Sequence, residues 1–282
     1  MKLSIPIDSD KSTRWVEQIS EFAQSKSIAH CQLEKLIGKL SFAQTSVFGK
    51  FARSLAQPLY DKLHAKSYCD SLSDDIITNL KWWKNALASV RSRVVSVRPK
   101  FAHYIIYTDA SWSDKKNKGR LAALLFDQRS GVLLDTLSSE VPMELADLFR
   151  DSAVIYGLEL FALVSAFAVW QDRLSFAQVT AYVDNDPSSD GVIKGSANHP
   201  IAQNFIRRFW QLIFLRSISV WVERVPSPRN WADMPTRDVE LPVKSLKYRE
   251  FPNICELINM FCAQWSEDPN FKRFQKNKRS YL

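Results

Sequence analysis

Apolar residues in the first 90 positions recur at the three- and four-residue spacing of amphipathic helices. The spacing predicts a small bundle of four helices over residues 1–90. The fourth helix follows Ser73, a residue that favours helix N-caps, and carries Asp74 and Asp75 in its first turn, where the helix dipole favours acidic groups. The inward-facing positions are Trp15, Val16, Ile19, Phe22 and Ala23; Leu33, Leu36, Ile37 and Leu40; Val47, Phe48, Phe51, Ala52 and Leu55; and Ile76, Ile77, Leu80, Trp83 and Leu87.

The pattern changes after a basic, polar stretch, residues 91–100, that we interpret as a linker. Runs rich in aromatic and β-branched residues are typical of strands, and longer apolar-periodic segments are typical of helices. The order of three strands, helix, strand, helix and strand predicts an α/β fold over residues 101–240, a mixed five-stranded sheet flanked by helices. A further helix, containing Ile254, Leu257, Ile258 and Phe261, and a basic tail are expected within 241–282. The expected strands are 101–108, 121–126, 131–137, 179–183 and 218–225, and the main helices are 148–170 and 201–215.

Two aspartates, Asp109 and Asp184, each come directly after a predicted strand. Ligands of open α/β sheets gather at the carboxyl ends of strands, so the two side chains are candidates for one site. An aspartate at a strand end can equally start a turn.

Glu159 lies inside a predicted helix that is apolar on nearly every side. Such a helix is mostly buried, and a buried carboxylate costs several kcal/mol unless a cation or strong donors meet it. A divalent metal would supply that partner. An arginine, or an exposed position for Glu159, is the alternative.

A fourth acid, Asp233, follows Asn230 in the segment 226–237, which is rich in proline and polar residues. Asn230 is a candidate N-cap for a short helix that would present Asp233 one turn later. Read alone, an aspartate at the start of a helix commonly complements the helix dipole.

Composition and charge indicate the kind of partner and the cellular compartment. The net charge is +8, and basic residues cluster at 115–120 and 272–279, which indicates a polyanionic partner such as nucleic acid. The four cysteines are scattered without a CxxC pair, so we expect neither a zinc site nor a disulfide framework. No apolar run is long enough to cross a membrane, and the first residues do not resemble a secretory signal. We therefore expect an intracellular protein, cytoplasmic or nuclear and not secreted.

Taken together, Asp109, Glu159, Asp184 and Asp233 form a set of oxygen ligands typical of Mg²⁺ or Mn²⁺. A pair of such ions can activate water and stabilise the departing oxyanion in phosphodiester hydrolysis. We predict these four as catalytic, metal-binding residues and two ions as the cofactor.

These motifs, in this order, resemble the ribonuclease H domain of retroelement reverse transcriptases. The resemblance covers about residues 101–240. Upstream, 33–43 and 58–60 are similar to the thumb-and-connection region of gypsy-like and DIRS-like reverse transcriptases. The motif segments are Tyr107-Thr108-Asp109-Ala110-Ser111, Leu158-Glu159-Leu160-Phe161-Ala162-Leu163, Tyr182-Val183-Asp184-Asn185 and Asn230-Trp231-Ala232-Asp233-Met234-Pro235-Thr236-Arg237.

The resemblance implies endonucleolytic cleavage of the RNA strand of an RNA–DNA hybrid. It makes Asp109 the central metal ligand, with Glu159 and Asp184 completing the primary site and Asp233 supporting the second metal. No Tyr-x-Asp-Asp polymerase motif occurs, so the fingers and palm of such an enzyme would be partners outside this chain. Many ribonucleases H carry a histidine in the loop before the last aspartate; residues 224–230 contain none, which suggests slow turnover.

Two other functions stay open. One is a catalytically silent nucleic-acid-binding remnant of the same family. The other is an integrase-like or resolvase-like nuclease, which would use the same sheet and a similar acidic site. The position of Glu159, on the helix directly after three strands, favours ribonuclease H.

Overall fold

The chain forms two compact units, one within residues 1–99 and one within 100–263. The computed structural model describes residues 2–89, 92–96, 102–150, 154–237, 239 and 248–262. A helical region precedes a mixed five-stranded sheet flanked by helices, which confirms the predicted α/β fold class. No helix in the described part of the chain is both long and apolar enough to span a bilayer.

The first unit is a helical bundle with a two-stranded sheet. Its elements are β1 (Lys2–Pro6), α1 (Ser9–Ser25), α2 (His30–Ala43), a π-helical segment (Gln44–Phe48), α3 (Gly49–Leu63), α4 (Asp74–Ser89) and β2 (Ser92–Ser96). The predicted inward positions are buried, apart from Trp15, Val16 and Ala23, which are half-buried. Trp82, beside the predicted Trp83, is also fully buried, because aromatic rings from the preceding segments pack edge-on against it.

Part of the predicted linker is a strand. Residues 92–96 pair antiparallel with β1, with Lys2 opposite Ser96 and Pro6 opposite Ser92. The adjacent β-branched residues Val94 and Val95 are typical of a strand. The remaining linker positions, 91 and 97–100, lie outside the described residues, as do the predicted basic tail positions 272–279.

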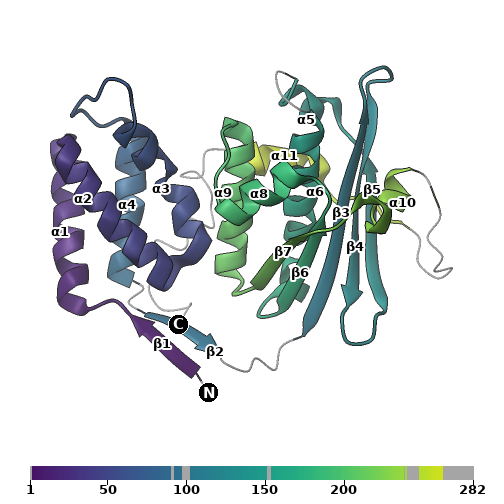
Figure 1. Ribbon diagram of the computed structural model, residues 1–282, viewed down its shortest axis with the longest axis horizontal. Coiled ribbons are helices and arrows are strands. Elements are labelled where there is room, and N and C mark those ends of the chain that lie inside the picture. The colour runs from purple at the N-terminus through teal and green to yellow at the C-terminus, as the bar shows by residue number, and fades with distance from the viewer. Residues whose placement is uncertain are drawn as a thin grey trace. The chain divides into compact units, whose positions relative to one another are not determined.

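The second unit is built on the five-stranded sheet, in the order β5-β4-β3-β6-β7 (Figure 1). The pairs β3–β4 and β4–β5 are antiparallel, and β3–β6 and β6–β7 are parallel. The elements are β3 (His103–Ser113), β4 (Lys118–Asp127), β5 (Leu133–Glu140), α5 (Met143–Asp147), α6 (Val154–Val169), α7 (Gln171–Leu174), β6 (Gln178–Val183), α8 (Asp186–Lys194), α9 (Pro200–Leu215), β7 (Ser219–Arg224), a 3-10 turn (Ser227–Arg229), α10 (Asp233–Thr236) and α11 (Ile254–Cys262).

Both faces of the sheet are covered at β4. Alternate residues of a strand point to opposite faces. Leu121, Ala123 and Leu125 belong to the main core with α6, whereas Ala122 and Leu124 form a smaller cluster that includes residues just before and within α10. This double burial explains why β4 is a nearly continuous apolar run. It also places α6 and α10 on opposite sides of the sheet, as Figure 1 shows.

The first strand of the sheet differs from its prediction, because β3 does not end at Asp109 but continues to Ser113. Its pairing with β4 extends to Ser113 opposite Lys118, whereas its pairing with β6 stops at Tyr107 opposite Tyr182. The antiparallel partner therefore prolongs the strand beyond the aspartate. Asp109 is a mid-strand residue that lies past the end of the neighbouring parallel strand.

The helices also refine the prediction. The long helix expected over 148–170 is shorter, α6, and is preceded by the separate helix α5. Helix α8 was not predicted; Asn185 caps it by accepting a hydrogen bond from the Ser188 N–H at 3.0 Å, and Pro187 occupies its first turn. Helix α11 packs into the core through Phe261, whose ring lies 5.6 Å from that of Phe161.

Candidate metal centre

Strand register brings Asp109 and Asp184 to the same edge of the sheet. Tyr107 on β3 and Tyr182 on β6 are directly paired, and their rings stack with centroids 5.0 Å apart. Each aspartate lies two residues beyond its tyrosine, and residues two apart on a strand share a face. Both aspartates therefore extend one row of side chains past the point where β6 ends.

Glu159 reaches this edge from α6, a helix in which every residue from Gly157 to Ala168 is buried. Only 3% of the Glu159 residue is exposed. Its Oε1 accepts a hydrogen bond from the Ala110 N–H at 3.1 Å. Since β3 has no strand partner on the β6 side beyond Tyr107, this N–H is available for the carboxylate. The sequence-based expectation that Glu159 is buried is confirmed.

Three of the four predicted acids converge. Asp109, Glu159 and Asp184 each place a carboxylate oxygen within 4.8 Å of the others, and we call this set the carboxylate cluster. Asp109 and Glu159 are buried, and Asp184 is half-buried. Asp233 is not a member: its Oδ1 lies 2.7 Å from Nε of Arg237.

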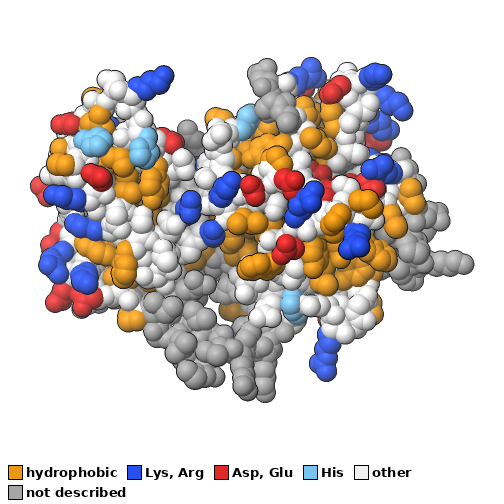
Figure 2. All heavy atoms as spheres, in the orientation of Figure 1, with side chains coloured by type: hydrophobic (Ala, Val, Ile, Leu, Met, Phe, Trp, Pro, Cys, Tyr) orange, Lys and Arg blue, Asp and Glu red, His pale blue; other side chains and the backbone are white. Residues whose placement is uncertain are grey.

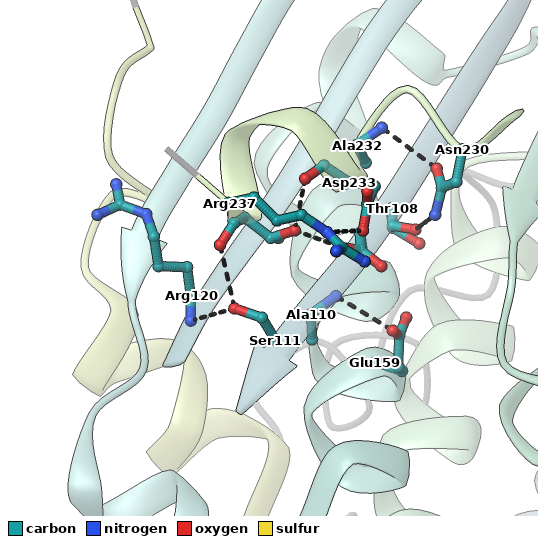
Figure 3. Close-up of polar contacts among 11 residues, drawn as sticks. Thr108, Ala110, Ser111, Arg120, Glu159, Asn230, Ala232, Asp233 and Arg237 are labelled. Carbon is teal, nitrogen blue, oxygen red and sulfur yellow. Dashed lines mark hydrogen bonds and ion pairs between the residues drawn. The ribbon is translucent and has the colours of Figure 1, made fainter. Parts of the chain in front are cut away.

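Helix α10 is tied to β3 beside the cluster (Figure 3). The Thr236 hydroxyl donates to Oδ2 of Asp109 and to the main-chain oxygen of Asp233. The buried Asn230 side chain donates to the Thr108 carbonyl at 2.9 Å. Its Oδ1 accepts from the Ala232 N–H at 3.2 Å. Asn230 thus anchors the loop to β3 and is not the N-cap of α10, which the structure places at Ala232.

Burial and mutual repulsion favour the neutral form of these carboxyl groups. Burial raises the pKa of Asp109 to about 7; the Thr236 hydrogen bond opposes this shift, and the charges of Asp184 and Asp233 add to it. Burial also raises the pKa of Glu159 well above its usual range, and the charges of Asp109 and Asp184 raise it further. Clustered acids without a cation are costly at neutral pH.

The carboxylate oxygens of the cluster are suitable ligands for a divalent cation. Oε2 of Glu159 is buried, and no hydrogen-bond donor among the described residues reaches it. Oxygen atoms from three carboxylates within 4.8 Å of one another are ligands of the kind that Mg²⁺ and Mn²⁺ prefer. A bound cation would partner that atom and lower the pKa of both buried acids.

Two residues near the cluster received no role from the sequence. Thr236 and Arg237 both follow Asp233 at helical spacing, and the Asp233–Arg237 separation of four residues is the spacing at which oppositely charged side chains meet on a helix. His199, the residue before α9, packs against Phe149 with ring centroids 4.8 Å apart.

No family model matches the sequence, and no match was found among curated proteins. Several solved structures are similar to part of the chain. The ribonuclease H1 LC11 in complex with RNA/DNA hybrid is 14% identical, with a TM-score of 0.40, over 48% of this chain and 95% of its own. Ribonuclease H1 from the archaeon Halobacterium salinarum is 14% identical, with a TM-score of 0.38, over 49% of this chain and 99% of its own.

A foamy viral protease-reverse transcriptase in complex with RNA/DNA hybrid is similar over more of this chain, 87%, and over 30% of its own, with 13% identity and a TM-score of 0.29. Because these identities and TM-scores are low, we infer the roles of the site residues from the contacts that these residues make in this chain.

Proposed function

We propose that the second unit is a metal-dependent ribonuclease H that hydrolyses the RNA strand of RNA–DNA hybrids. The observation that carries this proposal is the carboxylate cluster, in which Asp109, Glu159 and Asp184 bring oxygen ligands together at the edge of a mixed sheet. These three residues would hold Mg²⁺ or Mn²⁺. A pair of such ions would supply an activated water and would neutralise charge on the departing oxygen.

The residues of the chain preorganise the ligands. The Thr236 hydroxyl orients one oxygen of Asp109, and the Ala110 N–H orients one oxygen of Glu159. Within the described residues, no hydrogen-bond donor reaches the remaining Glu159 oxygen, which leaves it available to a cation. Since both groups are held by hydrogen bonds from β3 and α10, little reorganisation is needed when a cation enters.

The choice of hybrid as substrate is supported by the four ordered sequence motifs that resemble retroelement ribonucleases H. A net charge of +8 favours a polyanionic partner. Figure 2 shows lysine and arginine side chains among the acidic ones on the second unit. The same motifs, together with the upstream segments 33–43 and 58–60, support the retroelement reverse-transcriptase context for the whole chain, with the helical unit in the thumb-and-connection role.

A substrate panel tests the proposal. The full chain is incubated with end-labelled RNA–DNA hybrid, duplex RNA, duplex DNA and single-stranded RNA, in Mg²⁺, in Mn²⁺ and in excess chelator. We expect internal cuts in the RNA of the hybrid only, and only with metal. Asp109→Asn should lower the rate by about 1000-fold or more, since several kcal/mol of transition-state stabilisation are lost. Asp190→Asn, an exposed acid paired with Lys194, is the matched control and should cleave normally.

Three outcomes contradict the proposal. Cleavage that persists in excess chelator would show that the reaction does not require a metal ion. Binding of hybrid without cleavage by the parent chain indicates a silent nucleic-acid-binding module. Cutting of duplex DNA in preference to hybrid indicates an integrase-like or resolvase-like nuclease.

A further inference from the structure

Arg237 lies beside the carboxylate cluster, and among the described residues most of its hydrogen-bonding capacity is unused. Its Nε donates to Oδ1 of Asp233 at 2.7 Å. The side chain of Arg237 is 67% exposed, and that of Asp233 is 28% exposed. Within the described residues, the hydrogen bond and ion pair of the Arg237 side chain both use Nε, and neither Nη1 nor Nη2 makes one. The ion pair therefore fixes one edge of the guanidinium and leaves the forked pair of donors open.

The base of this side chain is held firmly. The Thr236 hydroxyl bonds to Asp109, and Oγ of Ser111 donates to the Thr236 carbonyl at 3.2 Å. Figure 3 shows Arg237 running back from the end of α10 toward Asp233, next to these contacts. Contacts to β3 thus hold the end of α10 in place, and the ion pair with Asp233 sets the direction of the guanidinium.

The electrostatics agree with the geometry. The hydrogen bond and charge of Asp233 raise the pKa of Arg237, and the charges of Asp109 and Asp184 raise it further. The guanidinium therefore interacts electrostatically with the carboxylate cluster. Asp233 itself is not one of the three converging acids.

We propose that Arg237 binds a phosphate of the nucleic-acid strand at the carboxylate cluster, and that Asp233 is a positioning residue that aims the guanidinium. This inference rests on the proposed function, because hydrolysis at the cluster requires a phosphodiester beside it. A guanidinium presents two parallel N–H donors that match two phosphate oxygens, which an ammonium group does not. Asp233 therefore acts through Arg237 in this arrangement.

The test separates binding from cleavage. Hybrid affinity of the full chain is measured in chelator over a range of salt concentrations, so that the result does not depend on catalysis. The variants are Arg237→Gln, Arg237→Lys, Asp233→Asn and the double variant with Arg237→Gln. Arg129→Gln is the matched control, because Arg129 is an exposed arginine in the β4–β5 turn, at the opposite end of the strands from the cluster. Thermal unfolding confirms that each variant is folded.

We expect Arg237→Gln to weaken hybrid binding by about 10-fold to 100-fold, the loss of a charge-assisted hydrogen-bonded pair. The salt slope of the logarithm of the binding constant should fall by roughly 1, the value of one phosphate contact. Arg237→Lys should recover the slope but only part of the affinity. In the Asp233→Asn background, replacing Arg237 should matter by less than about 3-fold, since the guanidinium is no longer aimed.

Two results overturn the inference. If Arg237→Gln changes affinity and slope no more than Arg129→Gln, or if the parent shows no salt-dependent binding, Arg237 does not bind phosphate. If replacing Arg237 costs the same with and without Asp233, and Asp233→Asn instead raises the Mg²⁺ concentration needed for cleavage, Asp233 is a metal ligand and not a positioning residue. Failure of the proposed function is distinct, because it would appear as absent cleavage with binding intact.

Discussion

At the scale of single residues, Glu159 is the strongest indication of a metal site. The sequence places it in an all-apolar helix, and the structure finds it 3% exposed, with one oxygen bonded to Ala110 and the other without a donor in the described part of the chain. Its burial could be predicted because charge within an apolar run is visible in the sequence. The Thr236 contact to Asp109 could not, because it depends on how α10 sits on the sheet.

The metal-free protein should lose stability as pH rises. The folded-state pKa of Asp109 is raised to about 7, and that of Glu159 is also raised. An acid with a raised folded-state pKa binds more protons in the folded state, so its contribution is present below its unfolded pKa and is lost as pH rises through the folded value. In chelator, the free energy of unfolding of the parent should therefore fall by about 2–4 kcal/mol between pH 5 and pH 8.

Glu159→Gln provides the comparison for this pH profile, because the amide keeps an acceptor for the Ala110 N–H and removes the charge. Its unfolding free energy should fall less with pH and should exceed that of the parent at pH 8. Denaturant unfolding at several pH values measures both. The contrary result is a variant that unfolds at a much lower denaturant concentration than the parent at pH 8, with an unfolding free energy that depends on pH as steeply as the parent's. That result would show that Glu159 has a structural partner and not an unpaired charge.

At the scale of elements, the pairing of strands determined where β3 ends and where the short strands β1 and β2 form, which the sequence pattern did not specify. The prediction that Asp109 ends its strand is wrong because β4 prolongs β3, and the short strands β1 and β2 were missed because few residues carry their pattern. Helix α6 was easier to predict, since it is long and apolar. Its close packing at Gly157 was not foreseen, because the spacing of residues does not reveal which ring lies opposite a glycine.

Gly157→Ala should destabilise the protein, although glycine to alanine within a helix normally stabilises by about 0.5–1 kcal/mol. A Cβ at this position would lie 2.4 Å from ring carbons of the fully buried Phe149. Overpacking of about 1–3 kcal/mol outweighs the helix propensity. The melting temperature should fall by several degrees.

Gly38→Ala is the matched control, since Gly38 lies within α2 and a Cβ there meets nothing within 4 Å. This substitution should raise the melting temperature slightly. Equal effects of the two substitutions would contradict the packing of α6 described here.

At the scale of the whole molecule, the order of strands and helices could be predicted, because the change from helical to strand periodicity near residue 100 is plain in the sequence. The mixed five-stranded sheet follows from that order. The relation among the four acids did not follow, because distance along the chain carries no measure of distance in space. Three acids converge, and Asp233 forms an ion pair with Arg237. Which side chains meet is settled by strand register and by the docking of α10.

Titrating Mn²⁺ into the full chain while following thermal unfolding tests whether the carboxylate cluster holds a divalent cation. We expect Mn²⁺ to stabilise the parent, by about 2.7 kcal/mol at 100 times the dissociation constant. Glu159→Gln should lose most of this stabilisation, while Glu144→Gln, which removes an exposed acid from α5, should keep it. Stabilisation by Mn²⁺ that is as large in Glu159→Gln as in the parent would contradict the account.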